Sequence, residues 1–445
     1  MLMTGTESPH GTNPLSLLAE DSFAPPEPRS IDEVGISAVL IETLVCNYLS
    51  QVGSGTGRMI AERLCLPFGI LESVLYSLRS RQIVVHGGHA ALNDYYYALT
   101  KQGAELASMT LSACNYVGPV PVPLEDYVVS VEAQSIRAEA PKRRQLEKAF
   151  EDIEIERELF DSLGPAINSG AGLFLYGAPG NGKTTLARRI TRCFGQTIWV
   201  PHAIIDDGQI VKFFDAAVHH PVRESESSVL RTSEFDARWV KIRRPTVIVG
   251  GELTMDNLEI RHSSKTNVSE APVQLKSNCG CLLIDDFGRQ RVEPVELLNR
   301  WIIPLESRSD ILTLASGKKI QVPFDQLIIF STNLDPNDLA DEAFLRRIPY
   351  KIEVGDPNVE EFQKLFQMVC RNMGCDYRSE VVEYLIATHY RPLGRPMRRC
   401  HPRDLMGQIR NYCTYNSMPL EMRCEHFDRV VKSYFTIVSG RTLGS

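Results

Sequence analysis

The stretch GAPGNGKT at residues 177–184 has the residue types and spacing of a phosphate-binding loop, G-x-x-x-x-G-K-[ST]. Its glycines allow a backbone turn in which several N–H groups face one point. Lys183 would contact the β- and γ-phosphates of a nucleotide, and the Thr184 hydroxyl would bind Mg²⁺. An apolar strand at 173–176 and a helix from Thr184 are expected on either side, and that helix N-terminus favours anions. We therefore predict binding of ATP and Mg²⁺ by Gly177, Ala178, Pro179, Gly180, Asn181, Gly182, Lys183, Thr184 and Thr185.

Two adjacent carboxylates follow a second apolar run, in LLIDDFG at 282–288. Asp285 suits a water-mediated contact with Mg²⁺, and Asp286 stands where a carboxylate would polarise the attacking water. Many ATP-hydrolysing proteins have Glu at the second position, and Asp is shorter by one carbon–carbon bond, about 1.5 Å. A third apolar run, 327–330, leads to Asn333, which we expect near the γ-phosphate, where it would orient water. We predict that this site hydrolyses ATP, with Asp286 and Asn333 as catalytic residues.

Three arginines complete the set of residues that could take part in the reaction. Arg346 and Arg347 end a short predicted helix in DEAFLRRIPYKI, and this position suits an arginine finger that reaches the γ-phosphate in a neighbouring subunit. Arg347 matches that role better because it stands nearer the following strand, but Arg346 stays open as an alternative. Arg403 begins another predicted helix in CHPRDLMGQIRNYC.

The N-terminal part predicts three helices, a two-stranded wing and a fourth helix. Apolar residues recur at helical spacing from Ile36 to Leu44, around 59–64 and around 71–78. Residues 83–85 and 95–99 read as strands, and HGGH at 86–89 as the turn between them. Over about 31–108 this order resembles a winged-helix domain. That resemblance implies DNA binding through the third helix or, equally, protein docking, because its arginines and acidic residues are balanced.

Composition bounds the remaining possibilities. The chain has 445 residues, which favours two to four domains, and 43% hydrophobic with 23% charged residues is typical of globular proteins. A net charge of −7 provides no strongly basic surface for nucleic acid. The 11 cysteines lack zinc-site spacing, so reduced thiols are expected. No apolar run is long enough for a membrane span and no signal-peptide pattern occurs, so we expect a cytoplasmic protein.

The sequence also suggests domain boundaries. We predict a disordered arm at 1–30, the winged helix at 31–108, a Pro-containing linker at 109–141, an α/β nucleotide-binding domain at 142–356 and a helical lid at 357–440. A polar stretch near 220–278 reads as an insertion. DILTLASGKKIQVPFDQL reads as a strand, a turn and a strand after a helix at 294–305. The fold class expected is α/β, with a parallel P-loop sheet, a C-terminal helical lid and the N-terminal winged helix.

The order of these motifs resembles that of the AAA+ ATPases over about residues 142–440. The resemblance implies that Asn333 is sensor 1, that Arg346 or Arg347 is the finger and that Arg403 is sensor 2. It also implies a homo-oligomer, a hexameric ring with ATP between subunits. The predicted hairpin before Asn333 is similar to that of the pre-sensor-1 hairpin group, which includes enhancer-dependent activators and MoxR-type chaperones.

The chain departs from these relatives at two places. Gly250–Thr254 stand where the activators have their G-A-F-T-G-A signature, and no aromatic pore loop occurs where unfoldases carry one. These departures count against polymerase activation and against threading of a protein through a pore. Our leading hypothesis is an ATP-driven machine that remodels a protein or nucleoprotein target. The alternatives are an ATP-switched DNA-binding regulator and a binding-only scaffold.

Overall fold

The computed structural model describes residues 23–153, 155–195, 197–222, 235–339 and 342–435. The chain divides into two compact units, which are described separately. The first comprises residues 1–140, 194–282 and 291–328, and the second comprises 141–193, 283–290 and 329–445. No helix in the described ranges is both long and apolar enough to cross a membrane. All 11 cysteines have free thiols.

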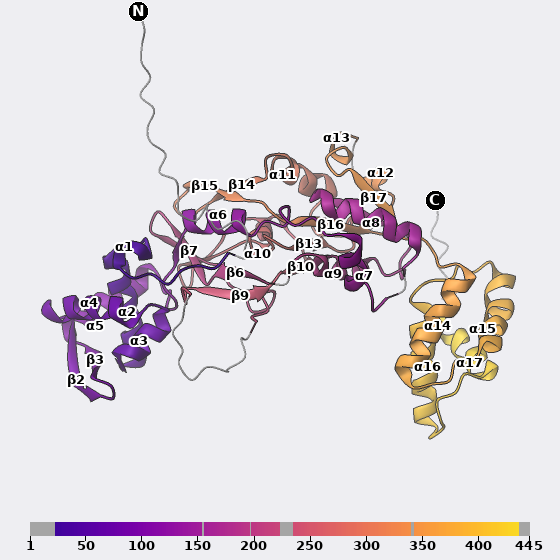
Figure 1. Ribbon diagram of the computed structural model, residues 1–445, viewed down its shortest axis with the longest axis horizontal. Helices are drawn as coiled ribbons and strands as arrows, with labels where there is room; N and C mark the ends of the chain where they lie inside the picture. The colour runs from indigo at the N-terminus through magenta and orange to yellow at the C-terminus, as the bar shows by residue number, and fades with distance from the viewer. Residues whose placement is uncertain (1–22, 154, 196, 223–234, 340–341, 436–445) are drawn as a thin grey trace, which may run out of the picture. The chain divides into compact units, whose positions relative to one another are not determined.

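The N-terminal part of the first unit is a small helical domain with a hairpin (Figure 1). Its elements are α1 (Ile31–Val34), α2 (Ala38–Val52), β1 (Ser54–Thr56), α3 (Gly57–Leu64), α4 (Phe68–Ser80), β2 (Val84–Ala90), β3 (Asp94–Leu99) and α5 (Lys101–Ala113). The strands form a sheet in the order β1-β3-β2. The side chains of Thr56 and Thr100 cap α3 and α5 by accepting hydrogen bonds from backbone N–H groups. The predicted order of helices and strands is therefore present here, and DNA or protein binding stays a prediction.

The hairpin turn lies elsewhere than predicted. Residues 86–89 belong to β2, with a register shift between His86 and Gly88, and the chain reverses at 91–93. Leu92 and Asn93 have φ values of 58° and 61°, the left-handed region that tight turns require. The prediction of a turn at HGGH was wrong because the paired glycines mark an irregular strand instead.

The predicted disordered arm and the predicted linker both contain residues that pack in the first unit. Residues 1–22 of the predicted arm lie outside the described residues, but Pro26 pairs with Phe235 and the Asp236 N–H donates to the Pro25 carbonyl at 2.9 Å. The predicted linker 109–141 contains the end of α5, strand β4 (Val122–Pro123) and α6 (Leu124–Ala133). Tyr127 on α6 is 2% exposed, so this segment is part of a core.

The remainder of the first unit consists mainly of short strands. They are β6 (Thr197–Pro201), β7 (Ala203–Asp206), β8 (Gln209–Lys212), β9 (Trp239–Arg243), β10 (Thr246–Val249), β11 (Arg261–Ser263), β12 (Val268–Glu270), β14 (Ser309–Thr313) and β15 (Lys319–Pro323), with η3 (Met255–Leu258), α10 (Val273–Lys276) and α11 (Pro294–Ser307). β14 and β15 form the predicted antiparallel hairpin after α11. The predicted insertion at 220–278 includes residues 223–234, outside the described ranges, and β10, which belongs to the main sheet. It is therefore only partly an insertion.

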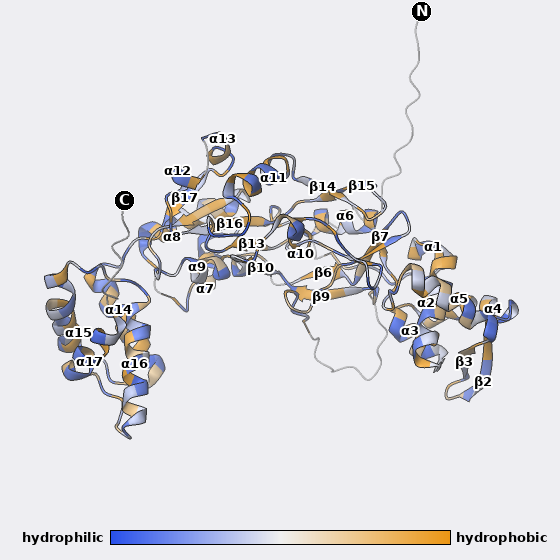
Figure 2. Ribbon diagram, turned by 180° about the vertical axis from the view of Figure 1, so that it is seen from behind, coloured by the Kyte–Doolittle hydropathy of each residue, from blue (hydrophilic) through white to orange (hydrophobic). Residues whose placement is uncertain are grey.

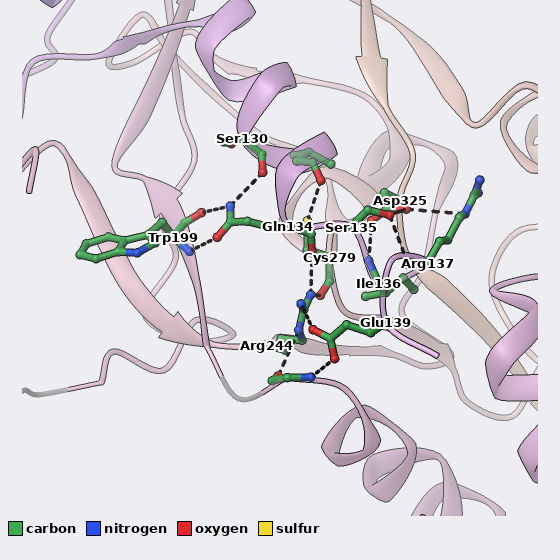
Figure 3. A network of polar contacts seen from close by, with 12 residues as sticks. Ser130, Gln134, Ser135, Ile136, Arg137, Glu139, Trp199, Arg244, Cys279 and Asp325 are labelled. Carbon is green, nitrogen blue, oxygen red and sulfur yellow. Dashed lines mark hydrogen bonds and ion pairs between the residues drawn. The ribbon is translucent and has the colours of Figure 1, made fainter. Parts of the chain in front are cut away.

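A buried polar network joins α6 to the strands of the first unit (Figure 3). The Arg244 guanidinium pairs with Glu139 and donates to the carbonyls of Gln134 at 2.9 Å and Cys279 at 2.7 Å. The Gln134 amide both donates to and accepts from the backbone of Trp199. Each of these buried groups is costly to leave without a partner, so the network fixes the segment after α6 in place.

The main sheet is a five-stranded sheet in the order β10-β13-β16-β5-β17, where β13 is Cys281–Ile284, β16 Leu327–Thr332, β5 Leu173–Tyr176 and β17 Tyr350–Glu353. β16 and β17 both pair with β5 in parallel. β16 is buried at every position, and its hydrophobic residues are visible in Figure 2. β5 leads into the loop at 177–182 and then α9 (Lys183–Ile190). The predicted α/β fold with a parallel P-loop sheet is confirmed.

The C-terminal part of the second unit is helical, coloured orange to yellow in Figure 1. It contains α14 (Val359–Met373), α15 (Ser379–Leu385), the π-helical η4 (Ile386–Tyr390), η5 (Arg391–Leu393), α16 (His401–Tyr415) and α17 (Cys424–Tyr434). Asn358 and Glu361 form a capping box that begins α14. The unit's other helices are α7 (Arg143–Ala149), α8 (Arg157–Ser169), η2 (Thr191–Cys193), α12 (Pro336–Leu339) and α13 (Glu342–Leu345). Residues 436–440 of the predicted lid lie outside the described ranges.

Candidate nucleotide site

The loop between β5 and α9 depends on glycine at two places. Gly177 and Gly180 have φ values of 128° and 86°, which residues other than glycine rarely adopt. A Cβ at Gly177 would lie 2.7 Å from the Val354 carbonyl oxygen, and one at Gly180 would lie 2.6 Å from Cys400 Sγ. The loop therefore has its shape because its neighbours leave room only for backbone.

Lys183 begins α9 and is only 6% exposed. Its ammonium donates to the carbonyls of Gly177 at 2.8 Å and Ala178 at 3.0 Å, and to Asn333 Oδ1 at 2.8 Å. Burial lowers the pKa of Lys183, whereas the carboxylates of Asp286 and Asp285 oppose this shift. A buried ammonium held mainly by neutral oxygens is well placed to gain from an anionic ligand.

We expect Lys183→Ala to weaken ATP binding by about 100-fold or more, because a charge-assisted hydrogen bond to phosphate contributes about 3 kcal/mol. Isothermal titration calorimetry with ATP measures the change, with Lys148→Ala as a control because Lys148 is an exposed lysine on α7. An ATP affinity of Lys183→Ala equal to that of the wild type would show that 177–184 is not the nucleotide site.

Thr184 and Asp285 form the oxygen-rich side of the site. Thr184 Oγ1 lies 3.0 Å and 2.9 Å from the two carboxylate oxygens of Asp285 at the end of β13. Hydroxyl and carboxylate oxygens suit Mg²⁺, which usually takes few protein ligands and completes its shell with phosphate and water. Within the described ranges, no group of three or more His, Cys, Asp or Glu side chains could hold a metal ion. The oxygens of Thr184 and Asp285 fit a Mg²⁺ that arrives with nucleotide.

Asp286 and Asn333 meet Lys183 at the same edge of the sheet. Asn333 Nδ2 donates to Asp286 Oδ1 at 3.1 Å, while Asn333 Oδ1 accepts from Lys183. Asp286 is exposed and has a φ of 49°, so its backbone leaves the strand in a turn. Its N–H donates to Asp285 Oδ1 at 3.2 Å. One amide thus bridges the predicted phosphate-binding lysine and the predicted catalytic carboxylate.

These residues line a cavity of about 400 Å³. Apolar side chains in the lining suit contact with a flat nucleobase; they are Ile153, Ile155, Leu159, Leu365 and Met368. Arg403 lines the cavity; its side chain is 73% exposed and is paired with Asp404. Arg399 also lines the cavity and donates to Glu361 at 3.2 Å. Arg399 was not among the predicted site residues; the signal that could have found it is its place two residues before α16.

The arginine pair is the part of the predicted site that the structure does not bring to the cavity. Arg346 is exposed and Arg347 half-buried, just after α13, and neither is among the described residues that line the cavity. A finger acting on its own chain's nucleotide is therefore not supported. Action on a neighbouring subunit stays a prediction.

Comparisons with known proteins give weak or partial similarities. Residues 358–433 match the family model described as a domain of unknown function, DUF8689. No curated protein matches the sequence at a significant level. A crystal structure of NtrX from Brucella abortus is similar at 12% identity and a TM-score of 0.37, and the similarity covers 66% of this chain and 63% of that chain. A crystal structure of NtrX from Brucella abortus in complex with ADP is similar at 13% identity and a TM-score of 0.39. The similarity covers 83% of this chain and 80% of that chain.

A RuvB mutant from Thermotoga maritima is similar at 14% identity and a TM-score of 0.38, with 66% of this chain and 74% of that chain covered. This chain spans less than two thirds of the first NtrX structure, at 63% of its length. Similarities this weak leave the functional assignment dependent on the site residues.

Proposed function

We propose that this chain binds ATP at the loop 177–184 and hydrolyses it. The observation that carries the proposal is the Asn333 side chain, which hydrogen-bonds to both Lys183 and Asp286 beside the Thr184–Asp285 pair. The groups that we assign to phosphate, metal and water are thereby close together, as hydrolysis of a phosphoanhydride requires. A site that only bound nucleotide would have no use for an oriented carboxylate and amide next to the phosphate position.

The residues have distinct roles in the proposed reaction. Lys183 and the loop N–H groups hold the phosphates and offset their charge. Thr184 and Asp285 would hold Mg²⁺, which supplies electrostatic stabilisation of the phosphate oxygens when bound. Asp286 accepts a hydrogen bond from the attacking water and draws its proton, and Asn333 fixes the direction of that carboxylate.

We further propose that the chain acts as an AAA+ ATPase in a ring of identical subunits. The order of the motifs supports this assignment, as do a helical segment that follows the α/β core and Arg403 on the cavity wall. In such a ring Arg347 would reach the neighbour's nucleotide, and turnover would drive the remodelling of a protein or nucleoprotein target. The domain at 31–108 would recruit that target.

A second candidate is an ATP-switched DNA-binding regulator. One observation favours it: an open groove of about 520 Å³ is lined by Arg79 and Lys101, beside β2 and the start of α5. Cations in a groove suit a phosphate backbone. The experiment that tests both candidates is steady-state ATP hydrolysis with and without duplex DNA. Turnover that DNA does not change favours a protein target, stimulation favours a DNA-engaging machine, and no turnover in any assembly state contradicts both.

A further inference from the structure

We propose that Asn181, Asp356 and Arg398 form a latch between the phosphate-binding loop and the C-terminal helices, and that nucleotide phosphates open it. The proposal rests on the proposed nucleotide site and adds positioning residues to it. None of the three was predicted to act in this way, and Asn181 was predicted only as part of the nucleotide-binding loop.

The Asn181 side chain contacts the segment 354–358 between β17 and α14, which we call the hinge segment. Asn181 is 1% exposed, and its amide nitrogen donates to Asp356 Oδ1 at 2.7 Å and to the Val354 carbonyl at 3.3 Å. Its amide oxygen accepts from the Arg399 N–H at 3.3 Å. A loop residue between two glycines therefore contacts two segments that lie far from it in the sequence. The separations are 175 residues for Asp356 and 218 for Arg399.

Backbone contacts and an ion pair strengthen this connection. The Cys400 N–H donates to the Gly180 carbonyl at 2.9 Å, and the Arg398 guanidinium pairs with the same Asp356 carboxylate that Asn181 contacts. α16 begins at His401, immediately after this segment. A displacement of residues 398–400 would therefore be transmitted directly to the helix that carries Arg403.

Charge makes the connection sensitive to a ligand. Arg398 is close enough to Lys183 for its positive charge to help lower the pKa of the lysine. A polyphosphate bound at Lys183 would attract Arg398 as well, in competition with Asp356. Binding would weaken the Arg398–Asp356 pair and release the hinge end of the latch, and by linkage the latch would weaken nucleotide affinity to the same degree.

The test combines hydrogen exchange with a double-mutant cycle. Amide exchange of residues 395–405 is measured in the full chain without nucleotide, with ADP and with a non-hydrolysable ATP analogue. We expect nucleotide to speed exchange at Arg399 and Cys400 in the wild type. In Asp356→Asn and Arg398→Gln these amides should already exchange rapidly without nucleotide. Arg423→Gln is the matched control, because Arg423 pairs with Glu421 on the same helical part and does not line the cavity.

The cycle uses nucleotide affinity as its second readout. We expect Asp356→Asn to raise nucleotide affinity about fivefold or more, because it frees Arg398 to reach the phosphates, and we expect this gain to be absent when Asp356→Asn is combined with Arg398→Gln. Arg398→Lys should restore part of the coupling because it keeps the charge. Additive effects, or exchange at 399–400 that nucleotide leaves unchanged, would overturn the latch.

The outcomes separate this inference from the proposed function. A wild type that binds nucleotide but never hydrolyses it would contradict hydrolysis and leave the latch intact if exchange and coupling behave as expected. A wild type that hydrolyses ATP with additive variants would retain the function and remove the latch. A wild type that binds no nucleotide would overturn both.

Discussion

Replacement of Asp286 by asparagine is expected to lower steady-state ATP hydrolysis by about 100-fold or more while ATP binding is retained. Asparagine has a similar shape and can still meet Asn333, but it cannot accept a proton from water, and general-base catalysis contributes about 10²–10⁴-fold. Asp286 Oδ1 accepts a hydrogen bond from Asn333 at 3.1 Å, and Asp286 is not part of the loop at 177–182 that would hold the phosphates. ATP binding should therefore not depend on Asp286. Coupled phosphate-release assays measure the rate, and calorimetry measures the affinity.

Asp286→Glu is the informative control. It keeps the carboxylate and lengthens its reach by about 1.5 Å, toward the length that related sites use. We expect its turnover to stay within about tenfold of the wild type. Equal rates in the wild type and Asp286→Asn would show that this second Asp is only structural.

Arg347→Ala is expected to reduce hydrolysis by about 10³-fold in the assembled protein, with ATP affinity largely unchanged. An arginine finger stabilises charge that develops in the transition state, and its loss costs about 10³–10⁵ in rate. Arg347 does not line the cavity of its own chain, so the effect should require neighbouring subunits. Turnover per subunit should rise with protein concentration in the wild type and stay flat in the variant.

Subunit mixing tests the direction of this contact. Inactive Arg347→Ala and Asp286→Asn chains, when combined, should form some shared sites in which both residues are intact. Recovery of activity on mixing supports action between subunits. Arg346→Ala, mixed with Asp286→Asn in the same way, distinguishes Arg347 from Arg346 as the finger. Complete absence of recovery in mixed oligomers would weigh against the assignment of Arg347.

The placement of the residues in the candidate nucleotide site was largely predictable because its signals are local. The spacing of Gly177–Thr184 specifies a loop at a helix start, and Asp285 and Asn333 each follow a buried strand. Strands that lie parallel in one sheet end at the same edge, so these side chains converge without any further information. The bonds of Lys183 to Asn333 and of Thr184 to Asp285 are the result.

The less predictable features depend on contacts between residues far apart in sequence. Nothing local in the Pro-rich segment before α6 shows that Tyr127 would be buried; that burial follows from strands that come much later in the chain. The latch has the same origin, because Asn181 looks like an ordinary loop residue until Asp356 and Arg398 are placed around it. The hairpin turn was misplaced because a glycine pair fits a strand irregularity as well as a turn.

The most direct test of hydrolysis at this site is a single-turnover measurement. Radiolabelled ATP is bound to excess wild-type protein at a concentration that permits assembly, Mg²⁺ is added, and the bound nucleotide is quenched and identified over time. We predict that bound ATP is converted to ADP and phosphate, and that it persists as ATP in the Asp286→Asn variant. Bound ATP that also persists unchanged in the wild type would contradict an intact hydrolytic site and favour a binding-only scaffold.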